Sequence, residues 1–153
     1  MQQLNRRDLG LMLSAFATLG GAISAAQSRT GEGALLAHSE IFTFDKLPVS
    51  TGTNGMATRA VIRGTLATGE YIEVHETTLP AGEMPHPPHR HTHSELLLIR
   101  EGKLEVISDG QHGLVEPGGV IFTASGVLHS LKNVGGVAAN YFVVAVGLQK
   151  VID

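Results

Sequence analysis

The chain has 153 residues, of which 42% are hydrophobic and 16% are charged, and it contains no cysteine and no tryptophan. Its formal net charge is −3 with the histidines neutral. This length predicts one domain that can bury a core, and the lack of a basic patch argues against a nucleic-acid partner. Without cysteine, thiolate metal sites and a disulfide framework are excluded, so core packing has to supply the stability.

Residues 1–26 look like an export signal of the twin-arginine type. Arg6 and Arg7 precede an apolar stretch rich in glycine and alanine, and small residues follow it. The stretch is about fifteen residues long, whereas a bilayer span needs about 20. We therefore expect cleavage near Ala26–Gln27, a periplasmic or otherwise exported protein, and no stable membrane insertion after cleavage. An uncleaved N-terminal helix that serves as an anchor is the alternative.

The segment behind the expected cleavage site, residues 27–37, is polar and contains glycine, so it is predicted to be a linker. A single domain then spans residues 38–153. Its first part, residues 38–47, is predicted to be an edge strand. Residues 48–55 are expected to form a loop, because they carry a proline and two glycines.

The rest of the chain is predicted to form short strands separated by turns that contain glycine. Asp109-Gly110 is a strong hairpin signal, and Gly69 joins two segments rich in valine, isoleucine and threonine. No convincing helix follows the signal segment, which favours an antiparallel sandwich or a small barrel. The predicted strands are 58–68, 70–79, 95–100, 103–108, 111–115, 120–123, 128–133 and 138–148.

The tract His86–Glu95 contains four of the eight histidines and ends with the carboxylate of Glu95. Side chains two apart in a strand share a face, so His89, His91 and Glu95 converge if one strand continues through them. His93 has the same parity. Imidazole is the commonest protein metal ligand, and a carboxylate added to it suits iron, manganese, zinc, nickel or copper. The tract therefore predicts a metal site, with a solvated histidine-rich loop as the alternative.

Two stretches of the chain together resemble the motifs of the cupin superfamily. The first motif is filled by Gly82, His89, His91, Glu95 and Gly102, and the second by Gly118, Gly126, His129 and Asn133. The sequence departs from the family pattern in two places: the gap from Gly82 to His89 is one residue longer, and Ala124 stands where the family has proline. Neither departure touches a ligand position. The resemblance covers about residues 58 to 146.

The resemblance implies an all-β fold, the cupin-type double-stranded β-helix, which is an antiparallel jelly-roll barrel. It also implies a divalent metal, with iron or manganese expected first, held by His89, His91, Glu95 and His129. Such a set leaves open positions on a five- or six-coordinate ion, as a catalytic metal requires.

The other polar residues near these motifs receive less definite roles. His93 is expected at the mouth of the site or behind the ligands, with direct ligation as a weaker alternative, and His86 is expected on the rim. His75 is interpreted as a structural histidine rather than a catalytic one. A general base besides Glu95 is not evident in the motifs, and Glu73 and Glu105 are the remaining possibilities.

Function divides into several classes, because one fold hosts many activities. The favoured hypothesis is a metal-dependent oxidoreductase of the dioxygenase type that acts on a small molecule. The alternatives are a metal-dependent isomerase or lyase, a non-catalytic barrel that binds a small ligand, and a metal-storage barrel. The resemblance also implies a homodimer that covers an exposed strand edge.

Overall fold

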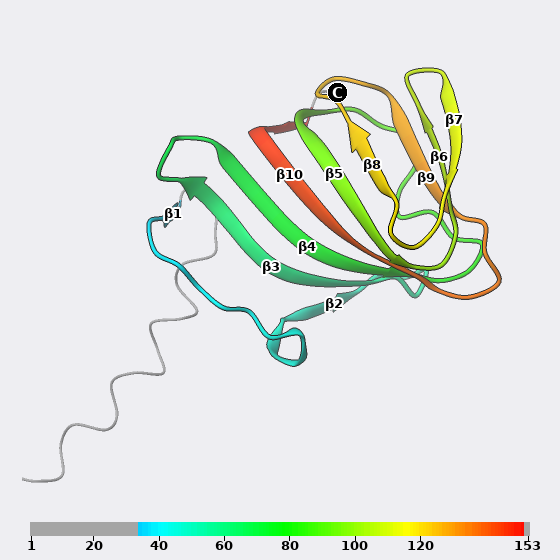
Figure 1. Ribbon diagram of the computed structural model, residues 1–153, viewed down its shortest axis with the longest axis horizontal. Helices are drawn as coiled ribbons and strands as arrows, with labels where there is room; N and C mark the ends of the chain where they lie inside the picture. The colour runs from blue at the N-terminus through cyan, green and yellow to red at the C-terminus, as the bar shows by residue number, and fades with distance from the viewer. Residues whose placement is uncertain (1–33, 152–153) are drawn as a thin grey trace, which may run out of the picture.

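The computed structural model describes residues 34–151, which fold almost entirely into β-strands (Figure 1). The export signal predicted for residues 1–26 lies outside this part and stays a prediction. No helix within residues 34–151 is long and apolar enough to cross a membrane. The elements are β1 Leu35–Leu36, the 3-10 turn η1 Phe44–Lys46, β2 Val49–Thr51, β3 Ala57–Leu66, β4 Tyr71–Leu79, β5 His91–Glu101, β6 Leu104–Ser108, β7 Gln111–Val115, β8 Val120–Thr123, β9 His129–Asn133 and β10 Ala139–Val151.

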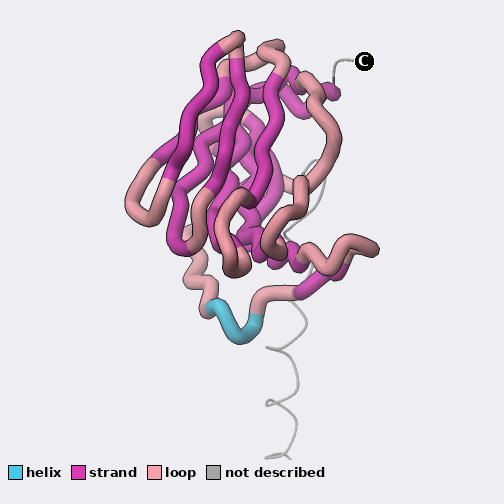
Figure 2. The backbone as a smooth tube through the Cα atoms, turned by 90° about the vertical axis from the view of Figure 1, so that its right-hand side faces the viewer, coloured by secondary structure: helices cyan, strands magenta, loops and turns pink. Residues whose placement is uncertain are grey.

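The strands form two sheets that face each other. The large, seven-stranded sheet has the order β1-β3-β4-β10-β5-β8, with β2 added on β3, and the three-stranded sheet has the order β7-β6-β9. All pairings are antiparallel except that of β1 with β3. In the side view, strands of the small sheet lie in front of those of the large one (Figure 2). This arrangement confirms the predicted antiparallel jelly roll.

The core lies between the two sheets and follows the alternation of side chains along each strand. In β5, Leu97 and Ile99 are buried, whereas Leu96 and Leu98 on the opposite face are exposed. In β10, Tyr141 is buried and its neighbour Phe142 faces the other side. The core is completed by Leu79, Leu104, Ile121, Leu131, Ala139 and Val143.

Two predictions for the start of the domain were wrong. Residues 38–47 do not form an edge strand but carry the turn η1, and residues 48–55 include the strand β2. The Phe44 ring lies 4.5 Å from the Arg59 guanidinium, and Arg59 in turn bonds the buried Glu76 at 2.9 Å. The segment is thus held on the outer face of the large sheet by side chains, and most of it stays exposed.

The end of the barrel opposite the histidines is closed by motif residues with backbone roles. Gly102 has a φ of 84°, and a Cβ there would lie 2.6 Å from Ala139, so only glycine fits the turn. Asn133 is fully buried. Its amide nitrogen donates to the carbonyls of Leu79 at 3.0 Å and Val137 at 2.8 Å, and its oxygen accepts the Gly135 N–H.

Replacing Asn133 with alanine should lower the free energy of unfolding by about 2 kcal/mol, because buried carbonyls would lose their donor. Urea denaturation measures this loss. The exposed neighbour Lys132 offers the control, since Lys132→Ala removes no buried hydrogen bond. Equal stability of the two variants would show that Asn133 does not close the barrel end.

Candidate metal centre

The candidate site lies where the chain passes from the small sheet into the large one. His89 forms an isolated bridge with His129 of β9, and the two residues exchange both backbone hydrogen bonds at 3.1 Å. The strand β5 begins only at His91. The expectation that one strand carries His89, His91 and Glu95 was therefore wrong for His89. Pairing with His129, and not strand parity, brings His89 to the site.

The loop between β8 and β9 is fastened to the start of β5 by polar contacts. The Gly126 N–H donates to the His91 carbonyl at 2.8 Å, and Arg90 Nη1 donates to the Gly126 carbonyl at 2.6 Å. Ser125 Oγ donates to the Thr92 carbonyl at 2.7 Å. Gly126 has a φ of 76°, which favours glycine at this turn. These contacts fix His129, just beyond the loop, against His91.

The structure brings together all four predicted ligands. His89, His91 and His129 each offer a ring nitrogen, and these nitrogens lie within 4.8 Å of one another. Glu95 lies beside them, with Oε1 3.2 Å from His91 Nε2 and Oε2 3.9 Å from His129 Nε2. His91 and His129 are buried, and Glu95 and His89 are partly buried. These residues could hold a metal ion.

The hydrogen bonds of two imidazoles orient their other nitrogens toward the centre. His91 Nδ1 lies 2.8 Å from the His93 carbonyl, and His129 Nδ1 lies 3.0 Å from the Val127 carbonyl. A carbonyl only accepts, so Nδ1 carries the proton in both rings and Nε2 presents a lone pair. Metal-binding histidines are commonly oriented in this way.

Three ring nitrogens at the centre are buried and have no hydrogen-bond partner among residues 34–151: His89 Nδ1, His91 Nε2 and His129 Nε2. His91 Nε2 is close to Glu95 Oε1, but the geometry is not that of a hydrogen bond, and with the ring neutral both atoms are acceptors. Buried acceptors that face each other are costly unless something bridges them. A divalent cation would satisfy all of them, so the donor set fits the metal that the motifs imply.

The charges of the site favour the metal-binding forms of its residues. Burial acts to raise the pKa of Glu95, but the hydrogen bond from His93 and the surrounding imidazoles outweigh it and lower this pKa to about 2. Burial, together with repulsion from His86 and other imidazoles, lowers the pKa of His89 to about 4. At neutral pH the carboxylate is therefore charged and His89 is neutral.

His93 and His86 lie around the four ligands. His93 Nε2 is 3.0 Å from Glu95 Oε1, and the His93 ring stacks on His91 with centroids 3.8 Å apart. His91, His93 and Glu95 form a second group that could hold a metal ion. His86 is exposed, and its ring centroid lies 3.9 Å from that of His89. The structure thus places His93 against the ligand carboxylate and His86 on the rim.

A cavity of about 180 Å³ opens beside the imidazoles inside the barrel. Glu95 and His129 line one side, and His75 of β4 lines another. Burial raises the pKa of Tyr141, which also lines the cavity, so this wall is uncharged. The remaining wall is largely apolar and includes Met56, Leu97, Val106, Ile121, Leu131 and Val143.

The structure places the two possible bases that the sequence suggested, Glu73 and Glu105, in different surroundings. Glu73 lies next to His75, with Oε1 3.5 Å from His75 Nδ1. Glu105 instead pairs with His112 at 2.9 Å on the exposed side of the small sheet. Sequence reasoning did not connect His75 with the site. The shared parity of residues 73 and 75 in a predicted strand was the signal that could have done so.

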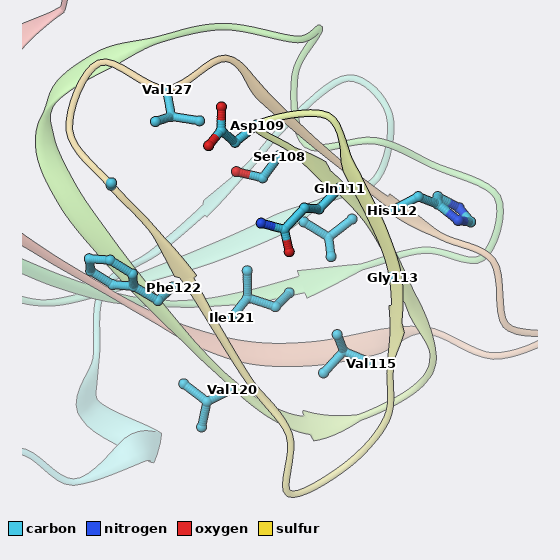
Figure 3. A pocket seen from close by; sticks show the side chains of 12 residues that line it. Ser108, Asp109, Gln111, His112, Gly113, Val115, Val120, Ile121, Phe122 and Val127 are labelled. Atoms are coloured by element: carbon cyan, nitrogen blue, oxygen red, sulfur yellow. The ribbon is translucent and has the colours of Figure 1, made fainter.

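A second cavity, of about 380 Å³, lies at the side of the barrel between β8 and the β6–β7 hairpin (Figure 3). Its labelled side chains include Val115, Val120, Ile121 and Phe122, with Gln111 among them. None of the four candidate ligands lines it. Although it is larger, it lacks the donor cluster, and we place the candidate site at the imidazoles.

Comparison with known proteins gives a consistent result. Residues 75–145 match the family model of the cupin domain, which includes all four candidate ligands. No curated protein matches the sequence of this chain.

Several solved structures share the fold at low sequence identity. An RmlC-like cupin from Shewanella frigidimarina is 17% identical with a TM-score of 0.61, covering 72% of this chain and 93% of that one. A predicted oxalate decarboxylase from Thermotoga maritima is 18% identical with a TM-score of 0.58, covering 71% and 100%. The polyketide cyclase RemF from Streptomyces resistomycificus is 17% identical with a TM-score of 0.58, covering 76% and 87%. Residues 75–145 thus match the cupin domain model, and the solved structures share the jelly-roll fold of this chain.

Proposed function

We propose that this protein is a divalent-metal-dependent oxidoreductase of the dioxygenase type that acts on a small molecule, with iron or manganese as the metal. The proposal includes the exported location expected from the N-terminal sequence. The observation that carries it is the set of three buried imidazole nitrogens without hydrogen-bond partners beside the ionised Glu95. Nickel, copper and zinc are compatible with the same donors.

The four residues would hold an ion with open coordination positions beside the cavity, which Glu95 and His129 line. When bound, an iron or manganese ion supplies Lewis acidity and redox chemistry at such positions. The protein itself would enclose the bound molecule. Leu97, Ile121 and Val143 form an apolar wall that displaces water from a bound molecule, and His93 holds Glu95 through its hydrogen bond.

A metal-dependent isomerase or lyase is the second candidate function. The observation that favours it is His75, an imidazole on the cavity wall with a carboxylate behind it, because proton transfer is the central step of such reactions. A barrel that only stores metal would not need the cavity next to the cluster, and one that only binds a small ligand would not need the pair of His75 and Glu73.

Protein purified without added metal should contain nearly one equivalent of iron or manganese, measured by elemental analysis. His91→Ala and Glu95→Ala should each lose most of it, because each removes a donor from the cluster. His112→Ala, which alters an exposed histidine paired with Glu105, is the control and should keep the metal. Metal-free wild type, or variants with unchanged content, would count against the metal site and in favour of a ligand-binding barrel.

The metal-free protein should lose stability as the pH falls from about 6.5 toward 4. The folded-state pKa of His89 is about 4 against an ordinary value of 6.5, so the unfolded chain binds more protons in this interval. Because the ring is partly exposed, the loss is expected to be about 1 kcal/mol rather than the full value of the shift. Urea denaturation at pH 7 and pH 4.5 in the presence of a chelator measures it. A His89→Gln variant should show a smaller loss, and an unchanged loss would assign it to other groups.

The homodimer expected from the sequence is supported by an apolar cluster on the outer face of the large sheet. Leu96 lies opposite Phe122, and Leu98 lies opposite Val120, on the adjacent strands β5 and β8. Phe122 is 62% exposed and Val120 is 55% exposed. Such a patch on an edge strand commonly needs a protein partner.

Light scattering should therefore give twice the monomer mass at micromolar concentration. Phe122→Glu should yield the monomer, because a charge would be buried in the interface. Val137→Glu, at an exposed valine in a loop, should leave the dimer intact. A monomeric wild type would exclude the dimer.

A further inference from the structure

The inner face of β3 and β4 carries a connected set of polar side chains near the cavity. Arg63 Nε donates to the Tyr71 hydroxyl at 2.7 Å, and this hydroxyl donates to Glu73 Oε2 at 3.0 Å. Glu73 Oε1 lies 3.5 Å from His75 Nδ1. The carboxylate of Glu73 is thus held from one side by Tyr71 and faces His75 on the other.

Strand register places this set in the same sheet as Glu95, two strands away from it. Glu73 pairs with Ala145 of β10, and Ala145 pairs with Glu95 of β5, so the two glutamates lie on one row two strands apart. Two strand spacings separate their backbones by roughly 10 Å. The residue between them is only an alanine, which leaves room inside the barrel. His75, Glu95 and His129 all line the same cavity.

The hydrogen-bonding roles allow His75, which lines this cavity, to act as a base. A carboxylate only accepts, so the His75 nitrogen next to Glu73, Nδ1, carries the proton and Nε2 holds a lone pair. Within residues 34–151, the polar contact of His75 is that of Nδ1 with Glu73, and Nε2 has no hydrogen-bond partner. The hydrogen bond from His75 lowers the pKa of Glu73 against the effect of burial, with further help from Tyr71 and Arg63. An ionised Glu73 would stabilise the imidazolium that forms when His75 takes a proton.

We propose that His75, positioned by Glu73, transfers the proton in this site, and that the substrates are small carbonyl compounds with an acidic C–H bond. This inference rests on the proposed metal-dependent function and adds a substrate class to it. The cavity of about 180 Å³ has the volume of about six waters, which limits the substrate to few non-hydrogen atoms.

The proposed step is a balanced proton transfer. His75 Nε2 takes the proton, the substrate C–H bond breaks, and its electron pair stays on the substrate as an enolate. The Glu73 carboxylate faces the resulting imidazolium at Nδ1. Return of the proton to another substrate atom gives an isomer and restores the neutral ring. The same enolate would be the first species formed if the substrate is then oxidised.

Deuterium exchange tests this step without knowledge of the natural substrate. Pyruvate, 2-oxobutanoate and dihydroxyacetone are incubated in D2O with the metal-containing protein as purified, and loss of their C–H signals is followed by proton NMR. At least one compound should exchange well above the protein-free rate. His75→Gln should slow this exchange about 100-fold and Glu73→Gln about 10-fold.

The exposed pair of His112 and Glu105 supplies a matched control, because it has the same two side chains at 2.9 Å but lies outside the cavity. His112→Gln and Glu105→Gln should leave exchange unchanged. A readout on the metal-free, nitrogen-15-labelled protein is independent of activity: His75 should carry its proton on Nδ1, and Glu73→Ala should shift it toward Nε2.

Elemental analysis of every variant separates this inference from the proposed function. Metal absent from the wild type would overturn the proposed function and this step with it. Metal present, with exchange equal in the wild type and His75→Gln, would overturn the role of His75 alone. Exchange of none of the three compounds, with the metal present, would overturn the substrate class and the proton-transfer role.

Discussion

The backbone pairing of His89 with His129 is the contact on which the candidate site depends. It joins the segment before β5 to β9 of the small sheet, and two residues later the chain enters the large sheet at His91. Ligands from both sheets therefore meet at one point. The loop that carries Gly126 is hydrogen-bonded to the start of β5 and keeps this junction closed. A site built across a sheet junction is held by the same hydrogen bonds that close the barrel.

The electrostatics of the junction fit a site that could hold a metal ion. Three buried ring nitrogens lack partners, and the nearby Glu95 is charged at neutral pH. Unsatisfied buried acceptors destabilise a fold, so a chain selected for stability alone would replace them. A bound cation would satisfy these acceptors, so the free energy that they cost the metal-free fold would favour metal binding. The hydrogen bonds of Nδ1 in His91 and His129 already fix the rings in the orientation that binding needs.

The cavity has two chemically different walls, separated by β10. One wall carries the candidate metal ligands, and the other carries His75 with Glu73 behind it. The small side chain of Ala145 lies on the row between the two glutamates. A small molecule bound between the walls would lie between the candidate metal ligands and His75, the arrangement that the proposed proton transfer needs.

The sequence by itself determined most of the strand pattern and pointed to the four candidate ligands. Alternation of side chains, the turns at Gly69 and Asp109-Gly110, and the spacing of the two motifs are local properties that are visible along the chain. Tertiary structure decided the rest. Residues 38–47 are held by Arg59 on another strand and do not pair as predicted, and His89 reaches the site through His129. His75 could be placed on the cavity only when β10 was known to lie between β4 and β5. Parity fixes which side chains of one strand share a face, but the strand that lies opposite depends on pairings distant in sequence.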